Sequence, residues 1–307
     1  FTSYAMQVVS AFMMLVMIFI ILPRAIVSAR RINEVLSTNP KILNGTVTET
    51  AESDKGTIEF KNVSFKYPDA SDYVLRDISF KAEKGKTIAF IGATGSGKST
   101  LINLIPRFYD ATDGDVLVDG VNVKEYDIES LNNKLGYVPQ KAVMFSGTVS
   151  SNVAYGNNGR DNYSADDIKQ AIKIAQGTEF VEKMENQYEG AIAQGGSNIS
   201  GGQKQRLAIA RAVCRKPEIY IFDDSFSALD YKTDRVLRSE LKKETAGTTT
   251  LIVAQRIGTI KDADCIIVLD KGNMVGKGTH SELMKNCEVY QQIALSQLSK
   301  EELGNDE

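Results

Sequence analysis

TIAFIGATGSGKST, residues Thr87–Thr100, joins an apolar run of strand length to a glycine-rich loop. Its second half fits the pattern G-x-x-x-x-G-K-[ST], which binds nucleotide phosphates where it connects a strand to a helix. Glycines allow a tight turn whose amides face phosphate oxygens, and the following helix contributes its positive N-terminal end. We expect Lys98 to reach the β- and γ-phosphates of ATP and Ser99 to ligate Mg²⁺. The predicted phosphate-binding residues are Gly92, Ala93, Thr94, Gly95, Ser96, Gly97, Lys98, Ser99 and Thr100.

A second apolar run, Ile219–Asp223, ends in an aspartate. A carboxylate at the end of a buried strand can hold Mg²⁺ opposite a phosphate-binding loop, directly or through water. Apolar runs that end in aspartate are common, so this signal is specific only because the glycine-rich loop accompanies it. Asp223 is therefore predicted to lie on the magnesium side of the nucleotide.

The composition limits the classes of protein to which the chain can belong. With 307 residues, 42% of them hydrophobic, the chain is long enough for one large core and additional segments. The formal net charge is −3 with acids and bases interspersed, which predicts no nucleic-acid partner. Three dispersed cysteines without metal-site spacing predict reduced thiols, and the only histidine, His280, is expected at the surface.

An apolar segment lies near the start of the sequence. Residues 4–22 contain only two polar members, and about 19 residues is the length that an α-helix needs to cross a bilayer. Arg24 and two further arginines follow, which predicts that this end of the helix is cytoplasmic. We expect the helix to continue past Pro23 to about Leu36. A buried core helix or an amphipathic anchor is the alternative interpretation.

The chain divides into four predicted regions. The last transmembrane helix and its cytoplasmic extension occupy residues 1–38, and a polar linker occupies residues 39–56. An α/β domain occupies residues 57–298, and an acidic tail, predicted to be disordered, occupies residues 299–307.

The α/β domain is predicted to contain a mostly parallel sheet. Alternating apolar residues in Ile58–Phe65 indicate a β-rich entry, and Glu218–Phe222 and Thr249–Val253, each bounded by turn or helix signals, are predicted to be short buried strands. In the middle of the chain, about Ala165–Met184 has apolar residues at roughly helical spacing, which predicts a helical segment. Helices between buried strands imply parallel pairing.

The string SGGQ, Ser200–Gln203, precedes the helix-forming stretch Lys204–Val213. Serine is a good N-cap, and the glycines allow backbone amides to approach an anion closely. Taken alone, the string is also consistent with a capped helix after a flexible loop. Lying between the glycine-rich loop and the Ile219–Asp223 run, it makes residues 57–290 resemble the nucleotide-binding domain of ATP-binding cassette (ABC) proteins. The resemblance implies a P-loop NTPase fold with a mostly parallel sheet core, an antiparallel β subdomain and a helical subdomain, here preceded by a transmembrane helix.

The resemblance also implies that two such domains dimerise head to tail. Each ATP then lies between the phosphate loop of one domain and Ser200, Gly201, Gly202 and Gln203 of the other. Tyr67 matches the aromatic residue that stacks on adenine, although an ordinary strand tyrosine is the alternative.

Other positions match the family's functional segments. Gln140 matches the glutamine that contacts Mg²⁺ and water and senses the membrane domain. Ser227–Asp230 matches the loop that crosses the dimer interface, and Glu189–Gly196 matches a segment that contacts the membrane domain in exporters. Gln194 stands where that segment usually has an acid, which leaves this contact open.

Two positions depart from the family's catalytic pattern. Asp224 stands where the family places the glutamate that polarises the attacking water, and Gln255 stands where it places a histidine that contacts the γ-phosphate. Aspartate is one methylene shorter, and glutamine donates a hydrogen bond but cannot become cationic. Such changes cost about 10²-fold through misplacement and about 10²–10⁴-fold where a general base is lost. We therefore predict an impaired hydrolytic site.

These features predict one subunit of a heterodimeric ABC exporter in the cell membrane, with five earlier helices preceding Phe1. A partner half-transporter supplies the intact glutamate and histidine, and the cargo is a drug, a lipid or another amphipathic small molecule. A homodimer with two slow sites and a peptide exporter are alternatives. A soluble ABC ATPase is a further alternative, which predicts a basic surface or a long coiled coil.

Overall fold

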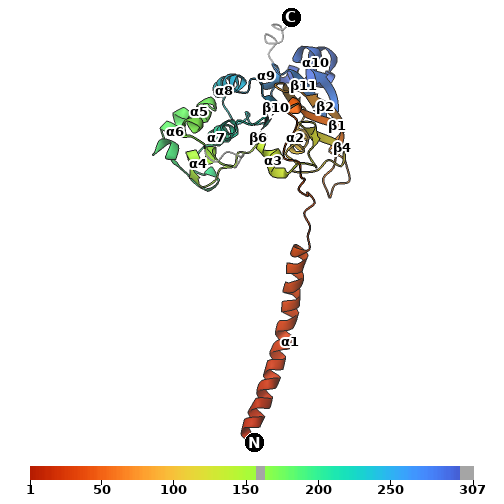
Figure 1. Ribbon diagram of the computed structural model, residues 1–307, viewed down its shortest axis with the longest axis vertical. Helices are drawn as coiled ribbons and strands as arrows, with labels where there is room; N and C mark the ends of the chain where they lie inside the picture. Colours follow the sequence, from red (N-terminus) through yellow and green to blue (C-terminus); the bar gives the residue numbers. More distant parts are fainter. Residues whose placement is uncertain (157–162, 298–307) are drawn as a thin grey trace. The chain divides into compact units, whose positions relative to one another are not determined.

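The computed structural model describes residues 1–156 and 163–297 (Figure 1). Its contacts divide the chain into two compact units, residues 1–43 and residues 44–307. The predicted acidic tail, residues 299–307, lies outside the described residues.

The first unit contains one long helix, α1 (Thr2–Leu36), of 35 residues. At about 1.5 Å per residue it is longer than the hydrocarbon core of a bilayer, and its most apolar stretch has a mean hydropathy of 2.6. None of its residues is buried in the protein. The helix continues through Pro23, as predicted. By length and composition it is able to span a membrane.

The second unit is built on two main sheets. The larger has the order β12-β11-β3-β10-β9-β6, in which every neighbouring pair is parallel except β11 with β12. The smaller, of order β2-β1-β4-β5, is antiparallel, and β7 and β8 form a separate pair. The strands are β1 (Ile58–Phe65), β2 (Leu75–Ala82), β3 (Thr87–Ile91), β4 (Asp113–Val118), β5 (Val121–Asn122), β6 (Leu135–Val138), β7 (Gly147–Thr148), β8 (Ala191–Ile192), β9 (Ile219–Asp223), β10 (Thr249–Val253), β11 (Cys265–Asp270) and β12 (Asn273–Gly278).

Side-chain alternation along β3 explains the layered packing. Ile88 and Phe90 belong to the core beneath the antiparallel sheet and α2, whereas Ala89 and Ile91 belong to the core under α9, α10 and α11. Successive residues of a strand point to opposite faces, so one strand serves both layers. The P-loop fold with a mostly parallel core and an antiparallel subdomain is confirmed.

The helices cover the parallel sheet and form a separate helical subdomain. In Figure 1, α4, α5, α6 and α7 gather on one side of the domain, and they share a hydrophobic core. After α1, the α-helices are α2 (Lys98–Asn103), α3 (Ile128–Asn133), α4 (Val149–Val153), α5 (Ala165–Ile174), α6 (Thr178–Glu182), α7 (Gly201–Cys214), α8 (Tyr231–Glu244), α9 (Ile257–Ile260), α10 (His280–Asn286) and α11 (Glu288–Gln297).

The helical segment predicted over about Ala165–Met184 forms two helices, α5 and α6. Gln176 adopts a left-handed conformation with φ 56°, and the Gly177 amide donates to the Ile172 carbonyl at 2.8 Å. This Schellman arrangement ends α5. The residue in the left-handed conformation is glutamine and not glycine, which makes the end of α5 at this position hard to predict.

The surface position predicted for His280 is wrong. The residue begins α10 with 8% of its surface exposed, and its Nδ1 lies 2.7 Å from the Tyr290 hydroxyl of α11. The histidine therefore joins two helices of the C-terminal layer.

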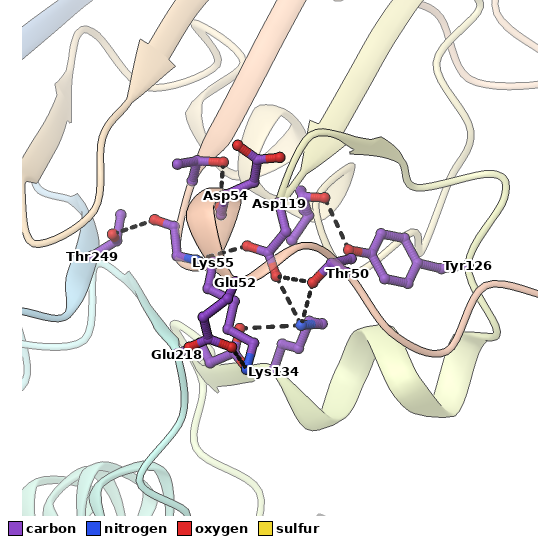
Figure 2. A network of polar contacts seen from close by, with 12 residues as sticks. Thr50, Glu52, Asp54, Lys55, Asp119, Tyr126, Lys134, Glu218 and Thr249 are labelled. Atoms are coloured by element: carbon purple, nitrogen blue, oxygen red, sulfur yellow. Dashed lines mark hydrogen bonds and ion pairs between the residues drawn. The ribbon is translucent and has the colours of Figure 1, made fainter.

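The predicted linker, residues 39–56, divides at Asn44, where the second unit begins. Its later part is fastened to the domain by a network of polar contacts around Asp119 (Figure 2). Asp119 Oδ1 accepts from the Gly56 amide at 2.7 Å, and its Oδ2 accepts from Thr50 Oγ1 at 3.2 Å. The Asp119 side chain is fully buried. Residues 44–56 are thus bonded to the domain.

Lys134, which follows α3 and directly precedes β6, completes this network (Figure 2). Its ammonium lies 2.8 Å from Asp119 and 3.1 Å from Glu218, and only 10% of the side chain is exposed. The Lys134 carbonyl also accepts from the Glu218 and Ile219 amides, which precede and begin β9. A buried ion pair connects the linker, the antiparallel sheet and the start of the strand that ends at Asp223.

Lys134→Ala leaves the buried Asp119 carboxylate without its cation, which is expected to cost about 3–5 kcal/mol in free energy of unfolding. Chemical denaturation of the purified protein measures this loss. Lys183→Ala is the matched control, because it removes an ion pair on an exposed helix face, where such pairs contribute little. Equal midpoints for the two variants would contradict a structural role for the Asp119 network.

Candidate functional site

The phosphate loop connects β3 to α2 as predicted and depends on glycine at two positions. Gly97 has φ 97°, and a Cβ there would lie 2.7 Å from the Leu75 side chain. A Cβ on Gly92 would overlap the Leu269 carbonyl oxygen of β11. Glycine is therefore required both by backbone conformation and by close approach.

Lys98, the first residue of α2, is held inside this loop. Its ammonium donates to the carbonyl oxygens of Gly92 at 2.8 Å and Ala93 at 2.9 Å, and to Ser96 Oγ at 3.3 Å. Burial lowers the pKa of Lys98, and the nearby carboxylates Asp223 and Asp224 oppose that change. The side chain is a cation that the loop itself orients.

Ser99 and Asp223 meet across the site. Ser99 Oγ donates to Asp223 Oδ1 at 2.9 Å, which links the first turn of α2 to the end of β9. Burial raises the pKa of Asp223, while the Ser99 hydrogen bond and the charge of Lys98 oppose the rise. A hydroxyl and a carboxylate at this spacing are hard oxygen donors of the kind that Mg²⁺ takes, so the residues fit that ion.

Asp224 accepts hydrogen bonds from two amides at the same oxygen. Gln255 Nε2 lies 2.7 Å and Gln140 Nε2 lies 3.2 Å from Asp224 Oδ2. Burial raises the pKa of Asp224, and hydrogen bonds, including those from the two glutamines, oppose the rise. The three residues that the sequence placed at the catalytic end of the site therefore converge.

Tyr67 lies beside the far end of the phosphate loop. Its hydroxyl is 3.0 Å from Thr100 Oγ1, and its ring packs edge-on against Phe65 and Tyr109. The side chain is half-buried in this aromatic cluster. Its position is compatible with the adenine-stacking role that the family resemblance implies.

The SGGQ string lies at the start of α7, apart from the residues around the phosphate loop. Ser200 is the N-cap, and it forms a reciprocal capping box with Gln203, with bonds of 2.8 and 3.3 Å. Space is open around Gly201, since no atom lies within 4 Å of a Cβ built there. The capped helix start is exposed.

One cavity is lined both by part of the phosphate loop and by the catalytic-end residues Gln140, Asp224 and Gln255. It has a volume of 270 Å³, and no residue of the SGGQ string is among the described residues that line it. Val74 and Val253 also line it but were not predicted, because neither bears a polar group that a motif would mark. The lining residues are Val74, Thr94, Gly95, Gly97, Lys98, Ser99, Thr100, Gln140, Asp223, Asp224, Val253 and Gln255.

A larger cavity of 620 Å³ lies between α8 and α9. Its lining includes Arg235, Arg238 and Lys261 but no residue of the phosphate loop. Size alone therefore does not identify the nucleotide site, whereas the convergence of loop amides, ammonium and carboxylates does.

Residues 75–227 match the family model described as ABC transporter. The chain carries the nucleotide-binding domain of an ABC transporter. The match includes the phosphate loop, SGGQ and Asp223 of this ABC domain.

Known proteins resemble the chain over nearly its whole length. An uncharacterized ABC transporter ATP-binding protein of Mycobacterium tuberculosis is 45% identical over 97% of this chain and 51% of its own length. An ATP-dependent lipid A-core flippase of Haemophilus influenzae is 39% identical over 90% of this chain and 46% of its own length. The structure of a bacterial Atm1-family ABC exporter with ATP bound has a TM-score of 0.84 at 32% identity, covering 94% of this chain and 50% of that chain. The chain thus spans about half the length of the relatives it matches.

Asp223→Asn is expected to stabilise the nucleotide-free ABC domain at neutral pH. Burial raises the pKa of this carboxyl, so its ionised form costs stability as the pH rises, and asparagine removes that cost. The melting temperature should rise by roughly 2–4 °C, the shift that about 1 kcal/mol produces in a domain of this size. The difference should vanish below the ordinary pKa of aspartate, where the carboxyl is neutral in both states.

The same variant should bind MgATP more weakly, because the amide is a poorer ligand for a divalent cation than the carboxylate. Thermal scans at several pH values and titration with fluorescent ATP measure both effects. Asp69→Asn, at an exposed position, is the control. A lower melting temperature for Asp223→Asn at neutral pH would contradict the predicted cost of ionisation.

Proposed function

We propose that this chain is part of one subunit of a heterodimeric ABC exporter, and that its own site binds MgATP but cleaves it slowly. Its SGGQ string completes the site of a partner that has the catalytic glutamate and histidine. The observation that supports this most directly is the hydrogen bonding of Asp224, a short side chain whose Oδ2 accepts from the side-chain amides of Gln140 and Gln255.

Binding requires only groups that the site contains. The phosphate loop supplies backbone amides, Lys98 supplies a cation, and Ser99 and Asp223 supply hard oxygen ligands. Mg²⁺, when bound, neutralises phosphate charge and orients the triphosphate. These residues are the same as those of the family's binding pattern, so tight retention of ATP is expected.

Cleavage of ATP requires a base that is positioned to accept a proton from the attacking water, and Asp224 is poorly positioned for this step. Asp224 is one methylene shorter than glutamate, so its carboxylate lies farther from the γ-phosphate side of the site. Its Oδ2 is engaged by Gln140 and Gln255, and Ser227 also forms a side-chain hydrogen bond to the carboxylate. Displacement of about 1 Å costs on the order of 10²-fold in rate. Gln255 adds no positive charge to compensate.

The exposed SGGQ string supports the second half of the proposal. Ser200, Gly201 and Gly202 present a capped helix start outside the chain's own cavity. Free backbone amides and the positive end of a helix of 14 residues favour an anion. A γ-phosphate held by the partner's phosphate loop is the anion that the family arrangement provides.

The apolar helix supports a membrane role. We infer that α1 spans the cell membrane as the last of several helices in the full-length protein, with the ABC domain in the cytoplasm. A lipid-like or other amphipathic cargo is the substrate class that we propose, because a relative 39% identical is named as a lipid A-core flippase.

Asp224→Glu combined with Gln255→His should activate this site by about 10²-fold, because a longer carboxylate and a cationic donor are then in place. The measurement is ATP hydrolysis by the full-length heterodimer whose other site has been silenced by replacing the partner's catalytic glutamate with glutamine. The unmodified chain in the same silenced assembly is the control. Unchanged hydrolysis, or purification of an assembly with a single kind of chain, would count against the proposal.

Gly201→Asp should abolish most hydrolysis by the assembly without unfolding the ABC domain. An acid in the first turn suits a helix but repels a γ-phosphate, and space for a side chain exists. Ala165→Asp is the matched control, since Ser164 caps α5 with the same reciprocal box. We expect at least a tenfold loss of hydrolysis for Gly201→Asp, roughly the cost of one poorly placed charge, and none for the control. ATP retention at this chain's own site should persist, and its loss would argue that SGGQ serves that site instead.

A further inference from the structure

The side-chain amide of Gln297 bridges the backbone on both sides of Arg256. Gln297 is the last residue of α11, and its Nε2 donates to the Gln255 carbonyl at 2.8 Å. Its Oε1 accepts from the Ile257 amide at 2.9 Å. The Gln297 side chain at the end of α11 is therefore hydrogen-bonded to the turn that follows β10. Its contact with Ile257 joins residues that are 40 positions apart in the sequence.

This turn lacks a cap of its own. Arg256 is the N-cap residue of α9, a helix of only four residues, and its side chain makes no capping hydrogen bond. The first amides of a helix have no partner within the helix, and Ile257 is fully buried. Gln297 supplies an acceptor for the N1 amide of α9, which an N-cap side chain at position 256 would not serve, because such a side chain accepts from the N2 or N3 amide.

The turn bonded to Gln297, residues 255–257, includes Gln255, whose side chain donates to Asp224. On its N-terminal side, the turn is held by the Ala254 amide, which donates to the Phe90 carbonyl at 3.1 Å. On its C-terminal side, Gln297 makes the hydrogen bonds that hold the Gln255 carbonyl and the start of α9. The direction of the Gln255 side chain thus depends on contacts from two elements, β3 and α11.

We propose that Gln297 is a positioning residue that sets residue 255 against Asp224 and the bound triphosphate, so that α11 is coupled to the nucleotide site. This inference rests on the proposed function, in which this chain's site retains ATP, and it assigns part of that retention to the side chain of Gln255. Gln297 itself does not line the nucleotide cavity, so its effect is transmitted through the backbone of the 255–257 turn.

A double-mutant cycle tests the coupling in the full-length assembly. Gln297→Met keeps the length of the side chain and removes both hydrogen bonds. We expect it to shorten the half-life of radiolabelled ATP bound at this chain's site by about 3- to 10-fold, the range that corresponds to one or two hydrogen bonds. In a Gln255→Ala background the same change should alter the half-life less than about twofold, because residue 255 then has no side chain to position.

Gln292→Met is the matched control, since this exposed glutamine lies on the same helix and bonds only to Glu288. It should leave the half-life unchanged. A general loosening of α11 would act equally in both backgrounds, and equal effects, or no effect of Gln297→Met, would overturn the inference. If Gln255→Ala itself leaves the half-life of bound ATP unchanged, the proposed role of Gln255 in retaining ATP fails. This single variant therefore tests the role of Gln255 separately from the positioning role of Gln297.

Discussion

Parallel pairing of β10 with both β3 and β9 is the constraint on which the nucleotide site depends. Val253, at the end of β10, is in register with Phe90 on one side and Asp223 on the other. All three strands therefore end at one edge, and the residues that follow them are the phosphate loop, Asp224 and the turn that carries Gln255. A slip of one residue would reverse the faces of β10 and separate these groups. The Lys134 carbonyl adds a second anchor at the opposite end of β9.

This geometry places three ionisable side chains in a buried cavity, which lowers the stability of the domain. Lys98, Asp223 and Asp224 lie together in one cavity, each with less than a tenth of its surface exposed. Burial disfavours the ionised form of each group, and two carboxylates face one ammonium. The protein reduces the cost with local hydrogen bonds, from Ser99 to Asp223 and from two amides to Asp224. The remaining excess of negative charge suits the binding of a divalent cation, so the site is organised for its ligand at the expense of stability.

Local signals in the sequence were sufficient for the fold class, and they marked most of the residues that line the cavity of 270 Å³. Thr87–Ile91 and Thr249–Val253 form strands with the predicted bounds, because buried parallel strands are continuous apolar runs. Long-range contacts were beyond reach. Nothing in the chain near Lys134 or Gln297 indicates the partners that they meet, and His280 was misplaced because its partner, Tyr290, is set by helix packing. The break at Gln176 was missed because glutamine rarely adopts the left-handed conformation.

Asp224 and Gln255 are physically coupled in this structure. Asp224 has 7% of its surface exposed, so its Oδ2 needs donors from the protein. Gln255 Nε2 reaches that oxygen at 2.7 Å, and an amide that always carries N–H groups satisfies it at every pH. A shorter side chain at position 255 would leave a buried acceptor without its closer partner, at a cost of about 1–3 kcal/mol. Asp224 and Gln255 therefore form a hydrogen-bonded pair, and a change at either position alters the surroundings of the other.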